Sequence, residues 1–280
     1  MQQLILSDHA EEQLRRLRGE REQRHQQARL QYQQELRSYD EQLVALDEAY
    51  HDAFRRLRLF QGTAAWWRHR ALQKRGDPPP PLPEGPTVEE QKRQAGAEGE
   101  QRLTAELITT LPGAAWMLIK GSENRKGAID YLLIGPAGVI AIECQHLSGT
   151  IICTQDRWIR QKYDPAGVPV TQVPILDRTG RSPSQQLNEP ATYLMECLSK
   201  KGVACAMTTA VILTHQDIRL GVVESPTVQI VLLNKLQPFL WEMCRTASSS
   251  IPVQRIVGFV KEDHRYWEEQ RGAEQQQQEG

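Results

Sequence analysis

The sequence predicts an α/β domain of three layers that follows a long helical region. Residues 7–75 are rich in Glu, Gln, Arg, Leu and Ala and contain no proline, which is a helix-forming composition. Residues 76–86, GDPPPPLPEGP, cannot form a helix and predict an extended spacer. From residue 87 onward, helical patterns alternate with short β-branched runs. We therefore expect helices over 1–75, a linker over 76–86, a globular domain over 87–269 and a disordered tail over 270–280.

The composition excludes several classes of protein. The chain has 280 residues, of which 39% are hydrophobic, and its net charge is -1. Its mean hydropathy is -0.55 and its pI is near 6.7, so there is no global basic field and any nucleic-acid contact has to be local. The five cysteines are widely spaced and include no CxxC pair, which predicts reduced thiols. No segment is typical of a signal peptide or a membrane span, so we expect a cytoplasmic protein with no membrane partner.

Two interleaved seven-residue series of apolar residues mark the helical region. They are Leu36, Leu43, Tyr50 and Leu57 in the first series and Tyr39, Leu46, Ala53 and Phe60 in the second. Such a stripe is the seam of a coiled coil or of a helical hairpin. A seam this narrow needs a partner, so we expect residues 32–60 to mediate self-association or to bind another helix.

Trp66 and Trp67 are adjacent in the sequence and flanked by basic residues. This arrangement resembles a surface that stacks bases and contacts phosphates. The alternative is packing, with one ring on the helical seam and the other on the neighbouring domain. Because aromatic rings dominate cores and interfaces generally, the sequence favours packing.

The elements of the globular domain follow from periodicity and from helix-breaking residues. A helix over 87–111 begins with a capping-box pattern from Thr87 to Glu90, and Pro112-Gly113 ends it. Prolines and glycines predict irregular structure between Trp158 and Pro183, and Pro190 predicts a kink or a restart in the helix that Ser182 begins. The other expected elements are strands at 114–120, 149–154, 206–215 and 228–233, a polar loop at 121–127, and helices at 234–246 and 252–269.

A β-hairpin in the middle of the domain carries two acids in unusual positions. Both of its strands are apolar on both faces, as in central strands that are covered on two sides, yet Asp130 and Glu143 lie inside them. A turn centred on residues 136–137 places the two acids opposite each other on one face. Two carboxylates so close favour a hard cation, Mg²⁺ or Mn²⁺, with the carbonyl of Cys144 and waters as further ligands. Alternatively, Asp130 is bonded to backbone amides and Glu143 is paired with an arginine such as Arg102.

A set of short motifs around this hairpin matches a known family. The motifs are Glu98-Gly99-Glu100, Ala128-Ile129-Asp130, the run from Ile134 to Val139, Ile142-Glu143, Gly149-Thr150-Ile151, and Ser182-Pro183 followed by Gln186. Over about residues 94–235 the chain resembles the nuclease-related domain (NERD) of the PD-(D/E)xK superfamily. The resemblance implies a restriction-endonuclease-like three-layer core with a central mixed sheet.

The resemblance also implies roles for single residues. Asp130 and Glu143 match the acids that bind the metal ion in this family. Glu100 matches an acid of the first helix that can point toward the metal ion, and Gln186 matches a polar helix residue near the site. The implied activity is Mg²⁺-dependent hydrolysis of phosphodiester bonds, with DNA as the partner.

Gln145 departs from the family pattern, which has a lysine at this position. That lysine is expected to position the nucleophilic water and to neutralise charge that develops on the phosphate. An amide donates a hydrogen bond but brings no charge, and Lys120 or Lys126 is a candidate substitute. The sequence therefore leaves open a metal-dependent endonuclease and a degenerate domain that binds nucleic acid or acts as a coiled-coil scaffold. His146 is expected to be structural, and His215 is a weak site candidate.

Overall fold

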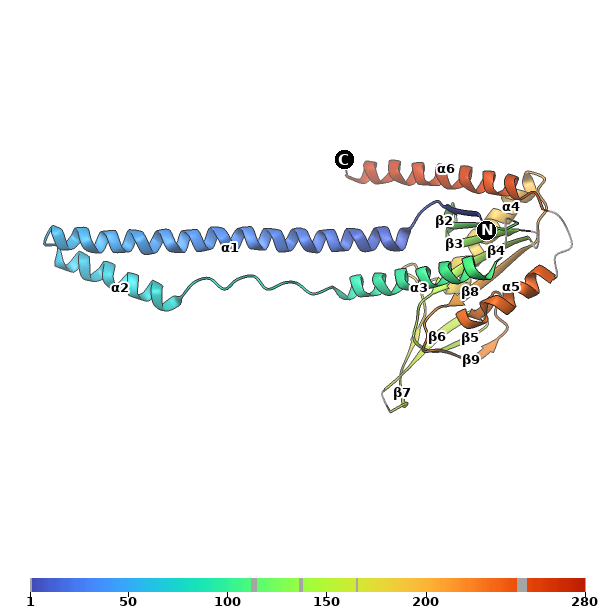
Figure 1. Ribbon diagram of the computed structural model, residues 1–280, viewed down its shortest axis with the longest axis horizontal. Coiled ribbons are helices and arrows are strands. Elements are labelled where there is room, and N and C mark those ends of the chain that lie inside the picture. The colour runs from blue at the N-terminus through green and yellow to red at the C-terminus, as the bar shows by residue number, and fades with distance from the viewer. Residues whose placement is uncertain (1, 112–114, 136–137, 165, 246–250, 280) are drawn as a thin grey trace. The chain divides into compact units, whose positions relative to one another are not determined.

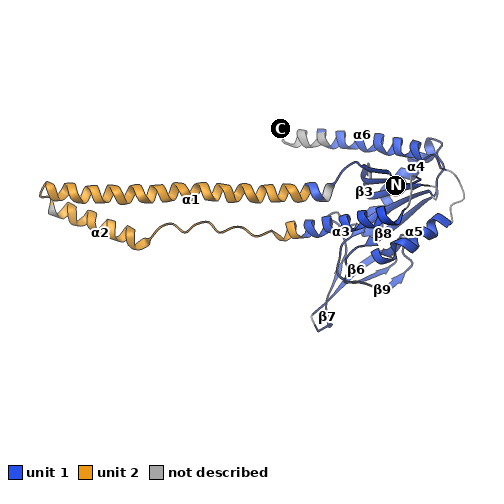
Figure 2. Cartoon of the chain, viewed as in Figure 1, with its two compact units in different colours: residues 1–12, 92–280 blue, residues 13–91 orange. Residues whose placement is uncertain are grey.

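A computed structural model describes residues 2–111, 115–135, 138–164, 166–245 and 251–279, and its elements are labelled in Figure 1. The expected helix stop at Pro112-Gly113 and the centre of the hairpin turn at 136–137 lie outside the described residues. The chain divides into two compact units, coloured separately in Figure 2: unit 1 comprises Met1–Glu12 and Lys92–Gly280, and unit 2 comprises Gln13–Gln91. Each unit is considered by itself.

Unit 1 contains a mixed sheet of six strands in the order β1-β2-β3-β4-β8-β10. β2, β3 and β4 pair antiparallel, whereas β1, β8 and β10 each pair parallel to a neighbour. The strands are β1 Gln2–Ile5, β2 Met117–Asn124, β3 Gly127–Gly135, β4 Gly138–Gln145, β8 Met207–Leu213 and β10 Gln229–Leu232.

Helices cover both faces of this sheet (Figure 1). Residues of α4 (Pro183–Lys200) and α6 (Val253–Glu279) share one buried cluster with Val139 and Ala141 of β4. Residues of α3 (Val88–Thr110) and α5 (Leu236–Arg245), the latter preceded by the short helix η1 (Leu233–Lys235), share the other cluster with Ile140 and Ile142. Because side chains alternate along a strand, β4 is apolar on both sides, as its sequence predicts. The predicted three-layer α/β fold is confirmed.

Unit 1 also contains a second sheet, most of which the sequence did not predict. Its four strands have the order β7-β6-β5-β9. β5 (Gly149–Thr154) has the predicted bounds, but β6 (Arg157–Tyr163) and β7 (Pro169–Pro174) occupy a stretch expected to be irregular, and β9 (Ile218–Glu224) was not predicted at all. The prolines at both ends of β7 misled the prediction, since proline is tolerated at the ends of an edge strand.

The first residues of the chain also differ from the prediction. The sequence predicts helix over 1–75, whereas Gln2–Ile5 form β1, which pairs parallel with Met117–Lys120 of β2. Just after it, buried Ser7 donates a hydrogen bond of 2.9 Å from its Oγ to the carbonyl of Gly121. A pairing across more than a hundred residues leaves no local signal in four residues of sequence, so periodicity could not reveal it.

Three smaller differences concern turns and helix ends. The stretch 121–127 is not a polar loop, because β2 continues to Asn124 and only Arg125 and Lys126 form the turn into β3. Helix α4 runs through Pro190 without a restart. Helix α6 extends to Glu279, where the sequence predicted a disordered tail from residue 270. The Glu- and Gln-rich composition of that tail is of low complexity, but both residue types also favour helix.

Unit 2 contains most of the long helix α1 (His9–Arg55) and the helix α2 (Leu59–Arg75), which returns along it. The hydroxyl of Tyr39 donates to the carbonyl of Leu72 across 3.2 Å, and a Cβ added at Gly62 would lie 3.5 Å from Cβ of Ala53. The seven-residue stripe up to Ala53 is buried or half-buried on α1, so a helix of the same chain contacts part of it. Self-association through residues 32–60 stays a prediction.

None of the helices in the described part of the chain is long and apolar enough to cross a bilayer. Residues 76–87, all of them described, form neither helix nor strand between α2 and α3. At the start of α3, the N–H of Glu90 donates to the Thr87 hydroxyl across 3.1 Å, which is one half of the capping box expected there.

The docking of the segment around β1 gives a test of the fold. Gly121 has φ +68°, and an added Cβ would lie 2.0 Å from the carbonyl oxygen of Ser7. Gly121→Ala should therefore lower the free energy of unfolding by about 3 kcal/mol, from the left-handed backbone and from the overlap. Urea denaturation followed by circular dichroism measures this. Gly258→Ala, on α6, is the matched control and should be neutral or slightly stabilising, because no described residue outside the adjacent helix backbone comes within 4 Å of the added Cβ. Equal stability of Gly121→Ala and wild type would mean that β1 is not docked in this way.

Candidate active site

The two acids of the hairpin lie where the β3–β4 ladder ends. The paired residues run from Gly135 with Gly138 to Tyr131 with Ile142, which is the register predicted from the sequence. One step further along the same register stand Asp130 and Glu143.

At this step a side chain takes the place of the next ladder bond. The backbone N–H of Cys144 donates to Oδ2 of Asp130 across 2.8 Å. The N–H and C=O of one residue in a strand point to the same side, so the carbonyl of Cys144 points to the Asp130 side as well. A carboxylate and a main-chain carbonyl thus share one edge of the site. The sequence also allowed that Asp130 is a structural acid bonded to backbone amides, and the bond from the Cys144 N–H agrees with that alternative as well.

Asp130 lies at an irregular point of β3. Ile129 and Leu132 belong to the buried cluster on the α4 side, whereas Tyr131 belongs to the cluster on the α3 side. Residues two apart in a regular strand share a face, so the alternation breaks at Asp130. The register places Asp130 next to Gly121 of β2, which has no side chain.

Glu143 is a buried carboxylate with 8% of its surface exposed. Its Oε1 accepts a hydrogen bond of 3.1 Å from Nε2 of Gln145, so this amide contacts the acid directly. Burial raises the pKa of Glu143 well above its usual range, and the charge of Asp130 raises it further, whereas the Gln145 hydrogen bond and the charge of Arg181 act in the opposite direction. Because Glu143 is shielded from water and lies near a second acid, its charged form is costly unless a cation is present.

Glu100 approaches from α3, on the other side of the sheet. Its Oε2 lies 3.1 Å from Nζ of Lys120, which also contacts Asp8 at 3.0 Å. The charge of Glu100 raises the pKa of Glu143, but less than burial and Asp130 do. Glu100 is therefore near the acids and acts on them electrostatically. Lys120, one of the two candidate substitutes for the missing lysine, is held by these two other acids.

Gly99 explains how α3 comes so close to the site. A Cβ at this position would lie 2.6 Å from Cβ of His146 and 2.7 Å from Oγ1 of Thr214. The Nδ1 of His146 lies 2.9 Å from the same Oγ1, so this side chain contacts Thr214, and its structural role stays a prediction. The ring of His215 lies beside it at a tilt of 51°, with the centroids 4.9 Å apart, and burial and the charge of His215 lower the pKa of His146.

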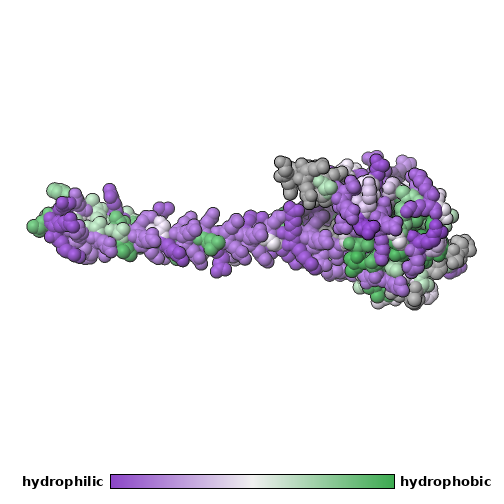
Figure 3. Space-filling model, turned by 90° about the horizontal axis from the view of Figure 1, so that it is seen from above, coloured by the Kyte–Doolittle hydropathy of each residue, from purple (hydrophilic) through white to green (hydrophobic). Residues whose placement is uncertain are grey.

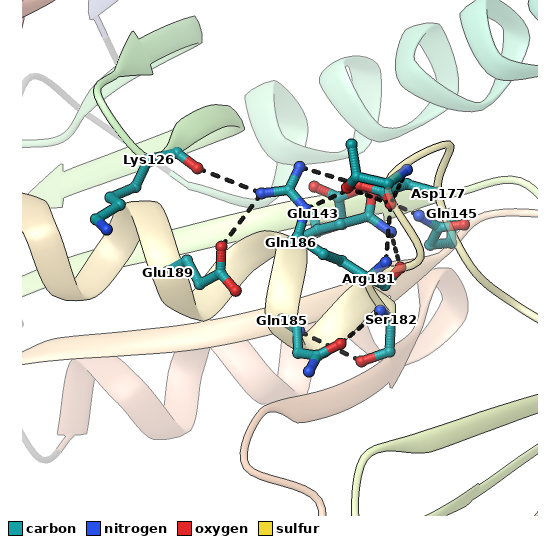
Figure 4. A network of polar contacts seen from close by, with 10 residues as sticks. Lys126, Glu143, Gln145, Asp177, Arg181, Ser182, Gln185, Gln186 and Glu189 are labelled. Atoms are coloured by element: carbon teal, nitrogen blue, oxygen red, sulfur yellow. Dashed lines mark hydrogen bonds and ion pairs between the residues drawn. The ribbon is translucent and has the colours of Figure 1, made fainter.

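The loop before α4 brings a cation that the sequence did not indicate. Figure 4 shows the guanidinium of Arg181 among several oxygen atoms. Its Nε donates to Oδ2 of Asp177 across 2.9 Å, and its Nη1 donates to Oε2 of Glu189 and to the carbonyl of Lys126, each across 3.3 Å. Lys126 thus contributes its carbonyl to this network.

Gln186, on α4, contacts the loop that precedes this helix. Its Nε2 donates to the carbonyl of Arg181 across 3.0 Å, so it braces the loop that carries the guanidinium. The helix itself begins as predicted: Ser182 is the N-cap, and it exchanges hydrogen bonds with Gln185 in a capping box (Figure 4).

The donor set at Asp130 and Glu143 fits a hard divalent cation. Carboxylate and carbonyl oxygens are the ligands that Mg²⁺ prefers, and this ion usually keeps several waters. Within the described residues, no group of three His, Cys, Asp or Glu side chains is arranged to hold a metal ion. Any ion here would therefore depend on the two acids, a backbone carbonyl and water.

The sequence around this site was compared with known protein families. The model of the nuclease-related domain matches residues 95–214. This part of the chain is a nuclease-related domain. The match spans β2 to β8 and includes Glu100, Asp130, Glu143, Gln145 and Gln186. No curated protein and no solved structure matched the chain in the corresponding searches.

The buried acid of the nuclease-related domain predicts a specific pH dependence. Because the pKa of Glu143 is raised on folding, its contribution to stability is fully present below the usual carboxyl pKa and is lost as the pH rises through the raised value. Glu143→Gln should therefore raise the free energy of unfolding at pH 7.5 by about 1–3 kcal/mol without metal. Urea denaturation at several pH values measures it.

The increase in the free energy of unfolding caused by Glu143→Gln should shrink toward pH 4, where the wild-type carboxyl is neutral as well. Glu196→Gln, at an exposed position on α4, is the control and should leave stability unchanged at both pH values. A Glu143→Gln protein that is less stable than wild type at pH 7.5 would contradict this account of the buried carboxylate.

Proposed function

We propose that the nuclease-related domain hydrolyses phosphodiester bonds of DNA with Mg²⁺ or Mn²⁺ held by Asp130, Glu143 and the carbonyl of Cys144. The observation that carries the proposal is the meeting of the two acids at the end of the β3–β4 ladder. There Cys144 fixes Asp130, and Glu143 is buried beside it. A bound divalent ion would polarise a phosphoryl oxygen and lower the pKa of a bound water.

The residues of this chain hold and orient the reacting groups. The Cys144 N–H donates to one oxygen of Asp130 and so orients this carboxylate at the edge of the site. Gln145 fixes Oε1 of Glu143 and brings a polar amide to the same face of β4. The burial of Glu143 limits water at this acid, which strengthens the electrostatic interaction between it and a cation.

Arg181 is our candidate for the positive charge that a lysine supplies in the family pattern. Its charge lowers the pKa of Glu143, so it acts on the site although it lies 36 residues beyond Gln145 in sequence. Asp177 and Glu189 hold the guanidinium in place. A fixed arginine can stabilise charge on a phosphate through directed hydrogen bonds, provided that it does not have to reorganise.

The alternative function is a non-cleaving domain that binds nucleic acid or supports a scaffold. The observation that favours it is the hydrogen bond that Gln145 donates to Glu143. This bond directs the amide toward the acid and not toward a substrate phosphate. A third possibility is that the helices of unit 2 do the work and that unit 1 anchors them.

The first test is cleavage by the purified full chain. Supercoiled plasmid, linear duplex and single-stranded DNA are incubated with Mg²⁺ or Mn²⁺, and nicking is followed on gels. Asp130→Ala should lower the rate about 100-fold or more, because the polarising effect of the ion is worth several kcal/mol. It should also weaken metal binding in calorimetry. Glu262→Ala, an exposed acid on α6, is the control and should keep both. Absence of cleavage on every DNA form, together with unchanged metal binding in Asp130→Ala, would refute the proposal.

The second test concerns the missing lysine. Arg181→Gln should slow cleavage about 10- to 100-fold if this arginine supplies the charge. The double variant Arg181→Gln with Gln145→Lys should regain most of the rate, because a charge returns next to Glu143. A loss of rate caused only by a disordered loop would not be rescued in this way. If wild type is inert and Gln145→Lys alone gains metal-dependent cleavage, the natural domain is a binding module.

A further inference from the structure

The turn from α1 to α2 and the helix α2 form a strongly basic segment in a chain of nearly zero net charge. Residues 54–75, FRRLRLFQGTAAWWRHRALQKR, contain no acid. The seven cations are Arg55, Arg56, Arg58, Arg68, Arg70, Lys74 and Arg75. Arg56 contacts Asp52 at 3.1 Å, one turn earlier on α1. A concentration of one sign of charge on a short segment indicates an anionic partner.

The same segment exposes large apolar side chains. Leu57 is 84% exposed, Phe60 is 92% exposed and Trp67 is 66% exposed. In Figure 3 the hydrophobic residues of unit 2 gather at the end where α1 turns into α2. Isolated exposed apolar residues are common, but three large ones among seven cations on one short segment are not explained by packing within unit 2.

Helix α2 has two distinct faces. Gly62 and Ala65 are buried and Leu72 is half-buried on the face toward α1. Phe60, Ala64, Trp67 and Ala71 follow the spacing i, i+4, i+7, i+11, so they form one stripe, and all four are exposed. At 100° per residue, Arg68 and Arg75 flank this stripe on one side, and Arg70 and Lys74 flank it on the other.

One of the flanking cations is fixed by an aromatic ring. The guanidinium of Arg70 lies 5.1 Å from the centroid of Trp66, and the ring of Trp66 packs edge-on against Trp67 with centroids 5.0 Å apart. Trp66, at 37% exposed, is thus occupied with its neighbours, while Trp67 keeps most of its surface free. The packing that the sequence favoured leaves both rings exposed, Trp66 less so than Trp67.

We propose that this face of α2 binds single-stranded nucleic acid, with bases stacked on Trp67 and Phe60 and phosphates contacted by the flanking cations. The two rings stand seven residues apart, which is about 10 Å along a helix and spans a few nucleotides. Exposed aromatic rings within a basic surface are the usual means of holding a single strand, whose bases are free to stack. A duplex keeps its bases stacked on each other and would meet only the cations. An anionic lipid surface would fit the charge, but an interfacial helix needs a wider apolar face than two large side chains and two alanines.

The experiment measures binding and does not require cleavage. The full chain, carrying Asp130→Ala and kept in EDTA, is titrated into fluorescein-labelled oligothymidine of 20 nucleotides, and anisotropy is followed at 50, 100 and 200 mM NaCl. Phe60→Ala with Trp67→Ala should weaken binding about 10-fold or more, from the loss of two stacking surfaces. Arg68→Gln with Arg75→Gln should lower the slope of log K against log salt by about 1.4, because two phosphate contacts are lost.

Matched variants on unit 1 serve as controls. Trp241→Ala removes a tryptophan on α5 that is 60% exposed, and Lys261→Gln removes an exposed cation on α6. Both should bind the oligonucleotide like the parent protein, and circular dichroism should show unchanged helix content in every variant.

Three results would overturn the proposal. The first is unchanged affinity in the α2 variants, and the second is an equal loss in the Trp241→Ala control. The third is binding of the parent protein to phosphatidylglycerol vesicles but not to the oligonucleotide, which would assign the surface to lipid. Because the Asp130→Ala background cannot hold a metal ion as proposed, failure of the cleavage proposal leaves this test unaffected.

Discussion

The hydrogen bond from the Cys144 N–H to the Asp130 carboxylate is the contact on which the candidate site depends. It stands where the next backbone bond of the β3–β4 ladder would form, so the ladder ends with an acid in place of a carbonyl. The register that brings Asp130 there also brings Glu143 opposite. That contact orients the Asp130 carboxylate toward β4, where Glu143 stands.

The rest of the domain makes it unfavourable for both acids at this edge to be charged. Helices on both faces of the sheet bury the strands, and burial raises the pKa of Glu143. Two negative charges in such a place are stable only with a cation or a proton, which is the constraint that a divalent metal ion would relieve. In the proposed reaction, Arg181 from the loop before α4 would supply the positive charge that Gln145 of β4 lacks.

Sequence reasoning succeeded where the determining contacts are local. The hairpin register follows from alternation and a short turn, and the start of α4 follows from Ser182 and Pro183, whose effects reach only a few residues. It failed where partners are distant. β1 pairs with β2 more than a hundred residues later, and β9 pairs with β5 across α4 and β8, so neither strand has a partner that its own sequence can reveal. The outcome for the tryptophans also depended on tertiary contacts, because only the return of α2 along α1 determines which face of α2 is covered.

By itself the sequence determined the fold class, the nuclease-related domain and the pair of acids, because periodicity, turn chemistry and motif spacing are properties of neighbouring residues. The tertiary structure alone decided which polar groups surround those acids. Lys120, which looked like a substitute for the missing lysine, is held by Asp8 and Glu100. Arg181, which carried no signal in the sequence, is held by Asp177 and Glu189 beside Glu143. The reason is physical: the direction of a long charged side chain is set by the partners that folding brings to it, and those partners come from distant parts of the chain.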